Sequence, residues 1–193
     1  MKEENIKRML DFGVEIISRK GYHNVGLKEL LDSTGIPKGS FYYYFNSKED
    51  FGRKVISHYA NNTLNYLQSM LLDKNKNPHE RLVFMFKDRA KAYKISAYKE
   101  GCLMGDCSNE LAGQIESVQI LLEQKFSSWS DVIELCIAEG QQLGEFNKNL
   151  AADELADFVL NSWEGALTRM KASGSIKPFE LFIDYTMNVI LKP

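Results

Sequence analysis

Apolar residues recur every three or four positions along almost the whole chain, and this spacing is typical of amphipathic α-helices. Ile6, Met9 and Ile16 follow it near the N-terminus, and Phe179 and Phe182 follow it near the C-terminus. Only 4 of the 193 residues are prolines, which favours long helices because proline disrupts a helix interior. No convincing strand pattern is found. We therefore predict an all-α fold.

Glycines, prolines and polar clusters interrupt this spacing and mark where the helices end. Glycines at positions 101 and 105 break the pattern, and residues 140–149 form a predicted loop. The interruptions divide the chain into about nine predicted helices, at residues 6–20, 27–33, 37–45, 48–72, 80–98, 107–113, 115–137, 155–170 and 179–190.

The composition allows a sizeable hydrophobic core, because 44% of the residues are hydrophobic. No apolar run approaches the roughly 18 residues that a membrane span needs, and the first ten residues mix both charge signs, unlike a signal peptide. The three cysteines suggest no disulfide framework, so we expect a cytoplasmic protein.

Charge is distributed unevenly along the chain. The net charge is −2, but residues 1–48 carry eight Lys and Arg against six Asp and Glu. The remainder of the chain is therefore acidic. A weakly basic N-terminal part suits contact with nucleic acid, although mixed charges of this kind are also typical of plain solvated surface.

The predicted helices at 27–33 and 37–45 are short, are joined by a tight turn at Gly35, and follow a longer helix at 6–20. This order is typical of a helix-turn-helix. In that motif the second helix enters the DNA major groove, with its N-terminal residues at the base edges. Residues 37–45 are therefore the predicted recognition helix.

The recognition helix begins with Pro37, Lys38, Gly39 and Ser40. Proline suits the first turn of a helix, since its missing N–H would have no partner there. Gly39 allows the backbone to come close to a duplex. Lys38 and Ser40 can contact phosphates or base edges.

A row of five aromatic residues, 41–45, follows in the same helix. Phe41, Tyr44 and Phe45 are three and four positions apart, so they share a helix face, and we assign them to the core. Tyr42 and Tyr43 then lie on the face that continues from Lys38 and Ser40, where their hydroxyls can reach phosphates. The alternative is that all five rings are packed.

Lys48 begins the predicted helix at 48–72, after Ser47 as the cap. Helix N-termini attract phosphates through free N–H groups and the helix dipole, and a lysine adds charge there. The alternative is a solvated lysine with no partner on DNA.

These residues carry a resemblance. The segment GYHNVGLKELLDSTGIPKGSFYYYFNSKEDF, residues 21–51, resembles the DNA-binding domain of the TetR family of bacterial transcriptional regulators, and the similarity extends over about residues 5–55. The family usually has Thr or Thr-Ser where this chain has Val25-Gly26, so a phosphate-contacting hydroxyl is missing. The predicted DNA-binding residues are Asn24, Lys28, Pro37, Lys38, Gly39, Ser40, Tyr42, Tyr43 and Lys48.

The resemblance implies a homodimer with a helix-turn-helix domain at 1–48 and a larger ligand-binding and dimerisation domain at 49–193. The last two helices, 155–170 and 179–190, usually form the dimer interface, although their apolar seams could equally be internal core. The usual mechanism is repression, in which the dimer binds a palindromic operator in double-stranded DNA. A small-molecule effector then changes the spacing of the recognition helices.

The C-terminal half resembles the NemR- and AcuR-like subgroup, whose regulators respond to electrophiles and acrylate. The subgroup has a recurring Gly-Cys-Leu, here at residues 101–103. The resemblance implies that Cys102 is a reactive sensor, with Lys171 as its partner and Cys107 as the second choice. A helix dipole can lower the pKa of a thiol and so increase the thiolate fraction. The alternative is that Cys102 is a small buried residue, which is the commoner situation for a free cysteine. Cys136 lies on an apolar helical stripe, and we assign it to the core.

A non-covalent effector pocket is the alternative, and its candidate lining residues are Phe86, Tyr93, Phe126, Trp163 and Met170. Aromatic and methionine side chains at helical spacing are more often plain core. Two rival functions remain. An enzyme would need a metal site, a nucleotide-binding loop or a nucleophile motif, and none is recognisable. A helical protein–protein adaptor, or a small-molecule-binding protein, would not need the 37–40 start of the recognition helix.

Overall fold

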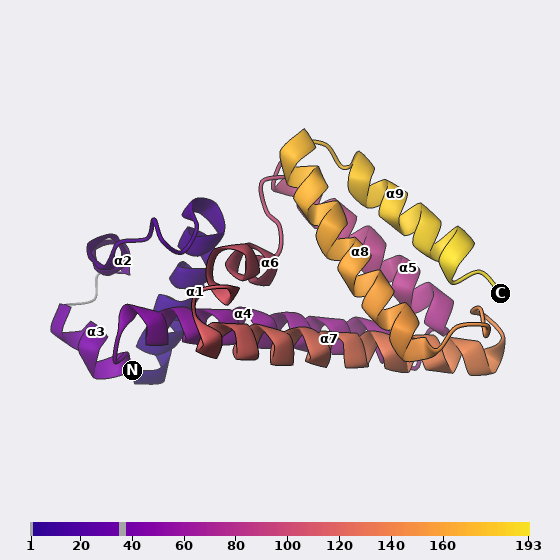
Figure 1. The fold of residues 1–193 in the computed structure, drawn as a ribbon, viewed down its shortest axis with the longest axis horizontal. Coiled ribbons are helices and arrows are strands. Elements are labelled where there is room, and N and C mark those ends of the chain that lie inside the picture. The colour runs from indigo at the N-terminus through magenta and orange to yellow at the C-terminus, as the bar shows by residue number, and fades with distance from the viewer. Residues whose placement is uncertain (1, 35–37) are drawn as a thin grey trace. The chain divides into compact units, whose positions relative to one another are not determined.

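The structure is a computed structural model that describes residues 2–34 and 38–193. Within these residues the chain forms nine α-helices and two short π-helical segments, and no strand (Figure 1). The prediction of an all-α fold with about nine helices is confirmed. The elements are α1 Lys2–Lys20, α2 Leu27–Thr34, α3 Lys38–Tyr44, α4 Lys48–Leu71, α5 Pro78–Ile95, α6 Leu103–Cys107, η1 Ser108–Ala112, α7 Glu116–Leu143, α8 Ala152–Ser173, α9 Lys177–Tyr185 and η2 Thr186–Ile190.

Helices α6 and α7 include residues at which the sequence predicted an interruption or a loop. Helix α6 begins at Leu103 and contains Gly105, which we expected to break the helix, and η1 continues it to Ala112. Helix α7 extends past residue 137 to Leu143, into the predicted loop. Gly140 lies inside this helix, and the ring of Phe146 fills the space that a side chain at position 140 would occupy.

The described residues belong to two compact units, each made of two chain segments. The first consists of Met1–Asn62 and Cys102–Lys125, and the second of Thr63–Gly101 and Phe126–Pro193. The predicted domain boundary after residue 48 stays a prediction. None of the described helices combines the length and the hydropathy that a membrane span requires.

Aromatic rings form the centre of the first unit. The ring of Phe41 lies 5.1 Å from that of Phe45 and 5.7 Å from that of Phe51, between ring centres. Gly13 of α1 faces Phe51 and Val55 of α4 so closely that a Cβ atom would lie 2.7 Å and 2.6 Å from their side chains. The missing side chain therefore lets α1 and α4 pack together.

Gly21 and Tyr22 end α1 and start the turn to α2. The N–H of Gly21 donates to the carbonyl of Ile17 at 2.8 Å, and its φ of +78° favours glycine. Tyr22 is buried, and its ring fills the space beside Gly52 in α4. Gly21 therefore ends α1, and Tyr22 anchors the following turn against α4.

A second aromatic cluster forms the core of the second unit. The ring of Trp163 in α8 lies 5.5 Å from that of Phe86 in α5 and 5.6 Å from that of Phe179 in α9. Phe86 and Phe182 are 5.2 Å apart in an edge-to-face arrangement. These rings join α5, α8 and α9, and α8 and α9 run side by side (Figure 1).

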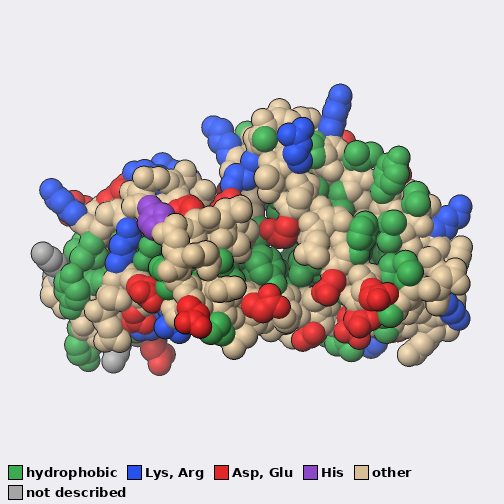
Figure 2. All heavy atoms as spheres, in the orientation of Figure 1, with side chains coloured by type: hydrophobic (Ala, Val, Ile, Leu, Met, Phe, Trp, Pro, Cys, Tyr) green, Lys and Arg blue, Asp and Glu red, His purple; other side chains and the backbone are tan. Residues whose placement is uncertain are grey.

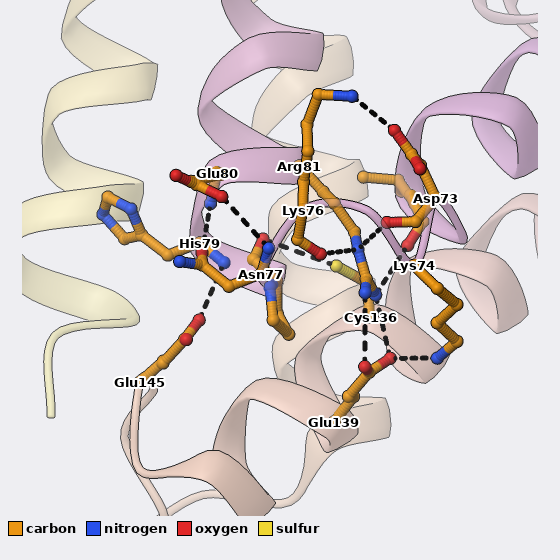
Figure 3. Close-up of polar contacts among 12 residues, drawn as sticks. Asp73, Lys74, Lys76, Asn77, His79, Glu80, Arg81, Cys136, Glu139 and Glu145 are labelled. Atoms are coloured by element: carbon orange, nitrogen blue, oxygen red, sulfur yellow. Dashed lines mark hydrogen bonds and ion pairs between the residues drawn. The ribbon is translucent and has the colours of Figure 1, made fainter.

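The turn between α4 and α5 is held by polar contacts. Asn77 caps α5: its Oδ1 accepts from the N–H of Glu80 at 2.9 Å, and the Glu80 carboxylate accepts from the N–H of Asn77 at 3.1 Å. Arg81 lies just behind this cap, and its side chain is 2% exposed. Figure 3 shows the guanidinium enclosed by carbonyl groups and by Glu139 of α7.

Candidate nucleic-acid interface

Helices α2 and α3, the two helices of the predicted helix-turn-helix, belong to the first unit. Leu30 and Leu31 are buried on the inner side of α2. The helix starts after Gly26, whose carbonyl accepts from the N–H of Leu30 at 3.2 Å, and no atom would contact a Cβ atom added there. Gly26 therefore occupies the cap position without a hydroxyl.

The start of α3 is described in part. Pro37 lies outside the described residues, whereas Lys38, Gly39 and Ser40 form the first turn of α3 by their backbone. Gly39 is exposed, and a Cβ atom there would meet nothing within 4 Å. Nothing in the fold itself requires a glycine at this position.

The aromatic row in α3 divides between core and surface. Phe41 and Phe45 are buried, whereas Tyr42 is 56% exposed and Tyr43 is 69% exposed. Tyr44 is only half-buried, so it takes a smaller share of the core than we expected. The structure therefore presents two tyrosines on the surface of the predicted recognition helix.

Lys48 is exposed at the first turn of α4, where Ser47 caps the helix by accepting from the N–H of Asp50 at 3.0 Å. Its ammonium group lies 4.8 Å from the centre of the Tyr22 ring and donates to the carbonyl of His23 at 3.5 Å. Lys48 is thus held beside the turn that connects α1 to α2.

Asn24 and Lys28 are also exposed, in the α1–α2 turn and on α2. The side-chain amide of Asn24 donates to the carbonyl of Lys20 at 2.8 Å. This contact satisfies one of the carbonyl groups left over at the end of α1. A capping role for Asn24 was missed at the sequence level, because a C-terminal asparagine also suits a plain turn.

The three cysteines are all buried. Cys102 stands directly before the first turn of α6, and 6% of it is exposed. Burial, together with the nearby carboxylates of Glu110 and Asp106, raises the pKa of the Cys107 thiol to about 12. Burial also raises the pKa of the Cys136 thiol to about 12. Neither Cys107 nor Cys136 is therefore a thiolate at neutral pH.

Lys171 and Trp163 both belong to α8 in the second unit. The stem of Lys171 lies over Gly101, since a Cβ atom on that glycine would stand 2.8 Å from Cδ of the lysine. Trp163 is buried among the phenylalanine rings. Among the described residues, no group of three or more His, Cys, Asp or Glu side chains could hold a metal ion.

Helices α8 and α9 carry an exposed apolar groove of about 650 Å³. Phe158, Leu181 and Tyr185 line it and are about half exposed, and Gly165 and Ala166 form part of its floor. Figure 2 shows hydrophobic side chains gathered over these two helices. Exposed apolar patches of this kind mark interaction surfaces in soluble proteins.

Two functional regions have counterparts among known proteins. Residues 9–53 match the family model described as bacterial regulatory proteins of the tetR family. Residues 78–186 match the model described as a tetracyclin repressor-like C-terminal domain.

Individual relatives cover almost the whole chain. The HTH-type transcriptional repressor DhaR of Mycobacterium sp. (strain GP1) is 31% identical, over 96% of this chain and 91% of its own. The transcriptional regulator AcuR of Cereibacter sphaeroides is 30% identical, over 88% of this chain and 78% of its own. The crystal structure of a regulatory protein TetR from Rhodobacter sphaeroides superposes with a TM-score of 0.88 at 28% identity, over 93% of this chain and 95% of that one.

Proposed function

Because the chain belongs to the TetR family of bacterial regulatory proteins, we propose that it is a repressor that binds a palindromic operator as a homodimer. A small-molecule or electrophile effector releases it from the DNA. The family consists of transcriptional regulators, which confirms the expectation that the chain is not an enzyme. It would act in the cytoplasm, where the DNA lies.

One observation carries the DNA-binding part of this proposal: Tyr42 and Tyr43 are exposed on α3, while Phe41 and Phe45 on the same helix are buried. Tyrosine hydroxyls can donate to phosphate oxygens and so fix the register of a helix on the duplex.

The remaining contacts surround this helix. The backbone at Gly39 is open to close approach, and Lys48 places a charge at the N-terminus of α4. We assign phosphate contacts to Asn24, Lys28 and Lys48, and contacts in the major groove to the first turn of α3, residues 37–40. The DNA-binding domain would then be residues 1–48, and residues 49–193 would bind the effector and dimerise.

Homodimerisation through α8 and α9 is supported by the apolar groove on these two helices. In a symmetric dimer the same patch on both copies faces itself, and Gly165 and Ala166 leave room for close approach. Two recognition helices related by a twofold axis read a palindrome whose half-sites are about one helical turn apart, roughly 34 Å.

For the effector we propose that Cys102 is the residue that reacts with electrophiles, with Lys171 as its partner. The raised pKa values of the Cys107 and Cys136 thiols count against those two cysteines, because a thiolate is the reactive species. Cys102 is buried, so a reagent reaches it through local opening of the segment. The alternative is a non-covalent effector bound near Trp163, which its packing among phenylalanine rings does not favour.

The DNA contacts are tested with the double variant Tyr42→Phe, Lys48→Ala. We expect it to bind the DNA upstream of its own coding region about 10- to 100-fold more weakly than the wild type, since two phosphate contacts are lost. The control is Tyr98→Phe, Lys99→Ala, which removes the same groups from the second unit. Equal binding by the Tyr42, Lys48 variant and the wild type would count against these assignments.

The sensor is tested by adding N-ethylmaleimide to the protein–DNA complex. We expect release of the wild type and of Cys136→Ser, and continued binding by Cys102→Ser. If Cys102→Ser is released as readily as the wild type, another group reacts. If no protein is released, the signal is a non-covalent ligand.

A further inference from the structure

Glu110 lies in the π-helical segment η1 and reaches the turn between α1 and α2, which belongs to the same unit. Its Oε2 accepts a hydrogen bond from the backbone N–H of His23 at 3.2 Å. Its Oε1 stands 2.6 Å from the position that a Cβ atom of Gly21 would occupy. The carboxylate therefore fits against the turn where Gly21 has no side chain. Single π-helical turns occur frequently at functional sites.

The backbone of His23 is held from two sides. Its N–H donates to the carboxylate of Glu110, and its carbonyl accepts from the ammonium group of Lys48 at 3.5 Å. Hydrogen bonds to charged groups are stronger than neutral ones. One residue of the turn thus connects an acid of η1 with a lysine at the start of α4.

This turn carries residues of the proposed DNA interface. Asn24 follows His23 directly, and α2 begins three residues later, at Leu27. A shift of the turn would therefore change where Asn24 and Lys48 stand relative to a DNA backbone. Phosphate contacts fix the orientation of a protein on the duplex, so small displacements here matter for affinity.

The segment that contains Glu110 also contacts α4 at two further points. The hydroxyl of Ser117 donates to the carboxylate of Glu49 at 3.1 Å, and Lys125 donates to the side chain of Asn61 at 2.8 Å. Glu110 extends this attachment to the α1–α2 turn. The same segment begins with Cys102, eight residues before Glu110.

We propose that Glu110 is a positioning residue for DNA binding: its carboxylate fixes the α1–α2 turn, and through it Asn24 and Lys48. This inference rests on the proposed function of the helix-turn-helix.

Three variants separate the effect of the Glu110–His23 hydrogen bond from the effects of the Glu110 charge and of overall protein stability. Glu110→Ala removes both the acceptor and the charge, whereas Glu110→Gln keeps an amide oxygen that can accept from His23. Glu116→Ala removes the same charge from an exposed position six residues later. It serves as the matched control.

Two readouts are needed, amide hydrogen exchange at His23 and affinity for the upstream DNA. For Glu110→Ala we expect exchange at His23 to be faster and DNA affinity to fall by about 10-fold, the effect of one lost hydrogen bond to a charged group. The urea midpoint should stay near that of Glu116→Ala. Glu110→Gln should restore slow exchange and most of the affinity.

These measurements separate the role of Glu110 from DNA binding itself. If the wild type binds DNA and Glu110→Ala binds equally well, the positioning role is wrong and the proposed function stands. A loss of affinity matched by Glu116→Ala, or explained by a lower urea midpoint, also overturns it. If the wild type shows no specific binding, the proposed function falls, and the role of Glu110 in DNA binding falls with it.

Discussion

Arg81 and Glu139 form a two-point ion pair between α5 and α7: Nη1 donates to Oε2 at 2.8 Å and Nη2 donates to Oε1 at 3.3 Å (Figure 3). The same guanidinium donates from Nε to the carbonyls of Asp73 and Lys76, at 2.7 Å and 2.8 Å. Nη1 also reaches the carbonyl of Leu71 at the end of α4, at 3.3 Å. The buried Arg81 side chain therefore donates hydrogen bonds to a carbonyl at the end of α4, to two carbonyls of the following turn and to the carboxylate of Glu139.

Replacing Arg81 should destabilise the fold strongly. In Arg81→Met the carbonyls of Leu71, Asp73 and Lys76 lose their donor, whereas Glu139 keeps its pair with Lys74. An unsatisfied acceptor typically costs about 1–3 kcal/mol, so the three together should cost about 3 kcal/mol or more. We expect a loss of this size in the free energy of unfolding, measured by urea denaturation. The control is Lys74→Met, because Lys74 pairs with the same Glu139 from an exposed position and should cost less than about 1 kcal/mol. If both variants lose the same free energy of unfolding, the burial of Arg81 does not strengthen its contribution to stability.

The Arg81–Glu139 pair should also make stability depend on pH. The hydrogen bond from Arg81, with a second from Lys74, lowers the pKa of Glu139 from 4.5 to about 2. Because the folded-state pKa lies below the unfolded one, the stabilisation is complete above about pH 4.5 and is lost as the pH falls towards 2. Glu139→Gln should be less stable than the wild type at pH 7, and the difference should shrink in acid. The measurement is urea denaturation of both proteins at a series of pH values. A difference in their free energies of unfolding that does not change with pH would contradict the role of Glu139.

Gly39→Ala should separate stability from DNA binding. Alanine favours a helix over glycine by roughly 0.5–1 kcal/mol, and the new Cβ atom meets open space in the free protein. We expect a small gain in the free energy of unfolding together with weaker DNA binding, because the methyl group prevents close approach to the duplex. Unchanged affinity, measured by fluorescence anisotropy, would show that no DNA backbone or base comes close to Gly39.

Leu181→Glu should dissociate the proposed dimer. Leu181 of α9 lies in the groove and is 59% exposed, whereas Leu135 of α7 lies outside the groove residues and is 57% exposed. A buried charge without a partner costs several kcal/mol at an interface, so Leu181→Glu should sediment as a monomer. Leu135→Glu should keep the oligomeric state of the wild type. Dimers of Leu181→Glu in analytical ultracentrifugation would place the interface elsewhere.

The sequence predicted the helices well because each has its own periodic apolar face, and it predicted the exposed Tyr42 and Tyr43 from their spacing to Phe41 and Phe45. Long-range polar contacts could not be predicted in this way. Glu110 is one acidic residue in a short polar segment, and no local pattern connects it with a backbone N–H 87 positions earlier.

The same limit applies to Arg81 in the second unit and to helix α6 in the first. Arg81 has the spacing of an ordinary helical residue, and its burial depends on carbonyls and on Glu139, 58 positions away. The start of α6 was missed because Gly105 was interpreted as an interruption, although this glycine lies inside the helix. Packing of distant segments decides these features, whereas the spacing of neighbouring residues decides the helices.

The proposed function depends on sequence-specific DNA binding through α3. Fluorescence anisotropy measures this binding, with a labelled fragment of the upstream DNA titrated with the wild type at about 50 mM and 200 mM salt against a scrambled competitor. We expect a preference for the upstream fragment of at least about 10³-fold over the scrambled DNA, and an affinity that falls steeply with salt. Equal binding to both fragments, or no binding to either, would rule out this function.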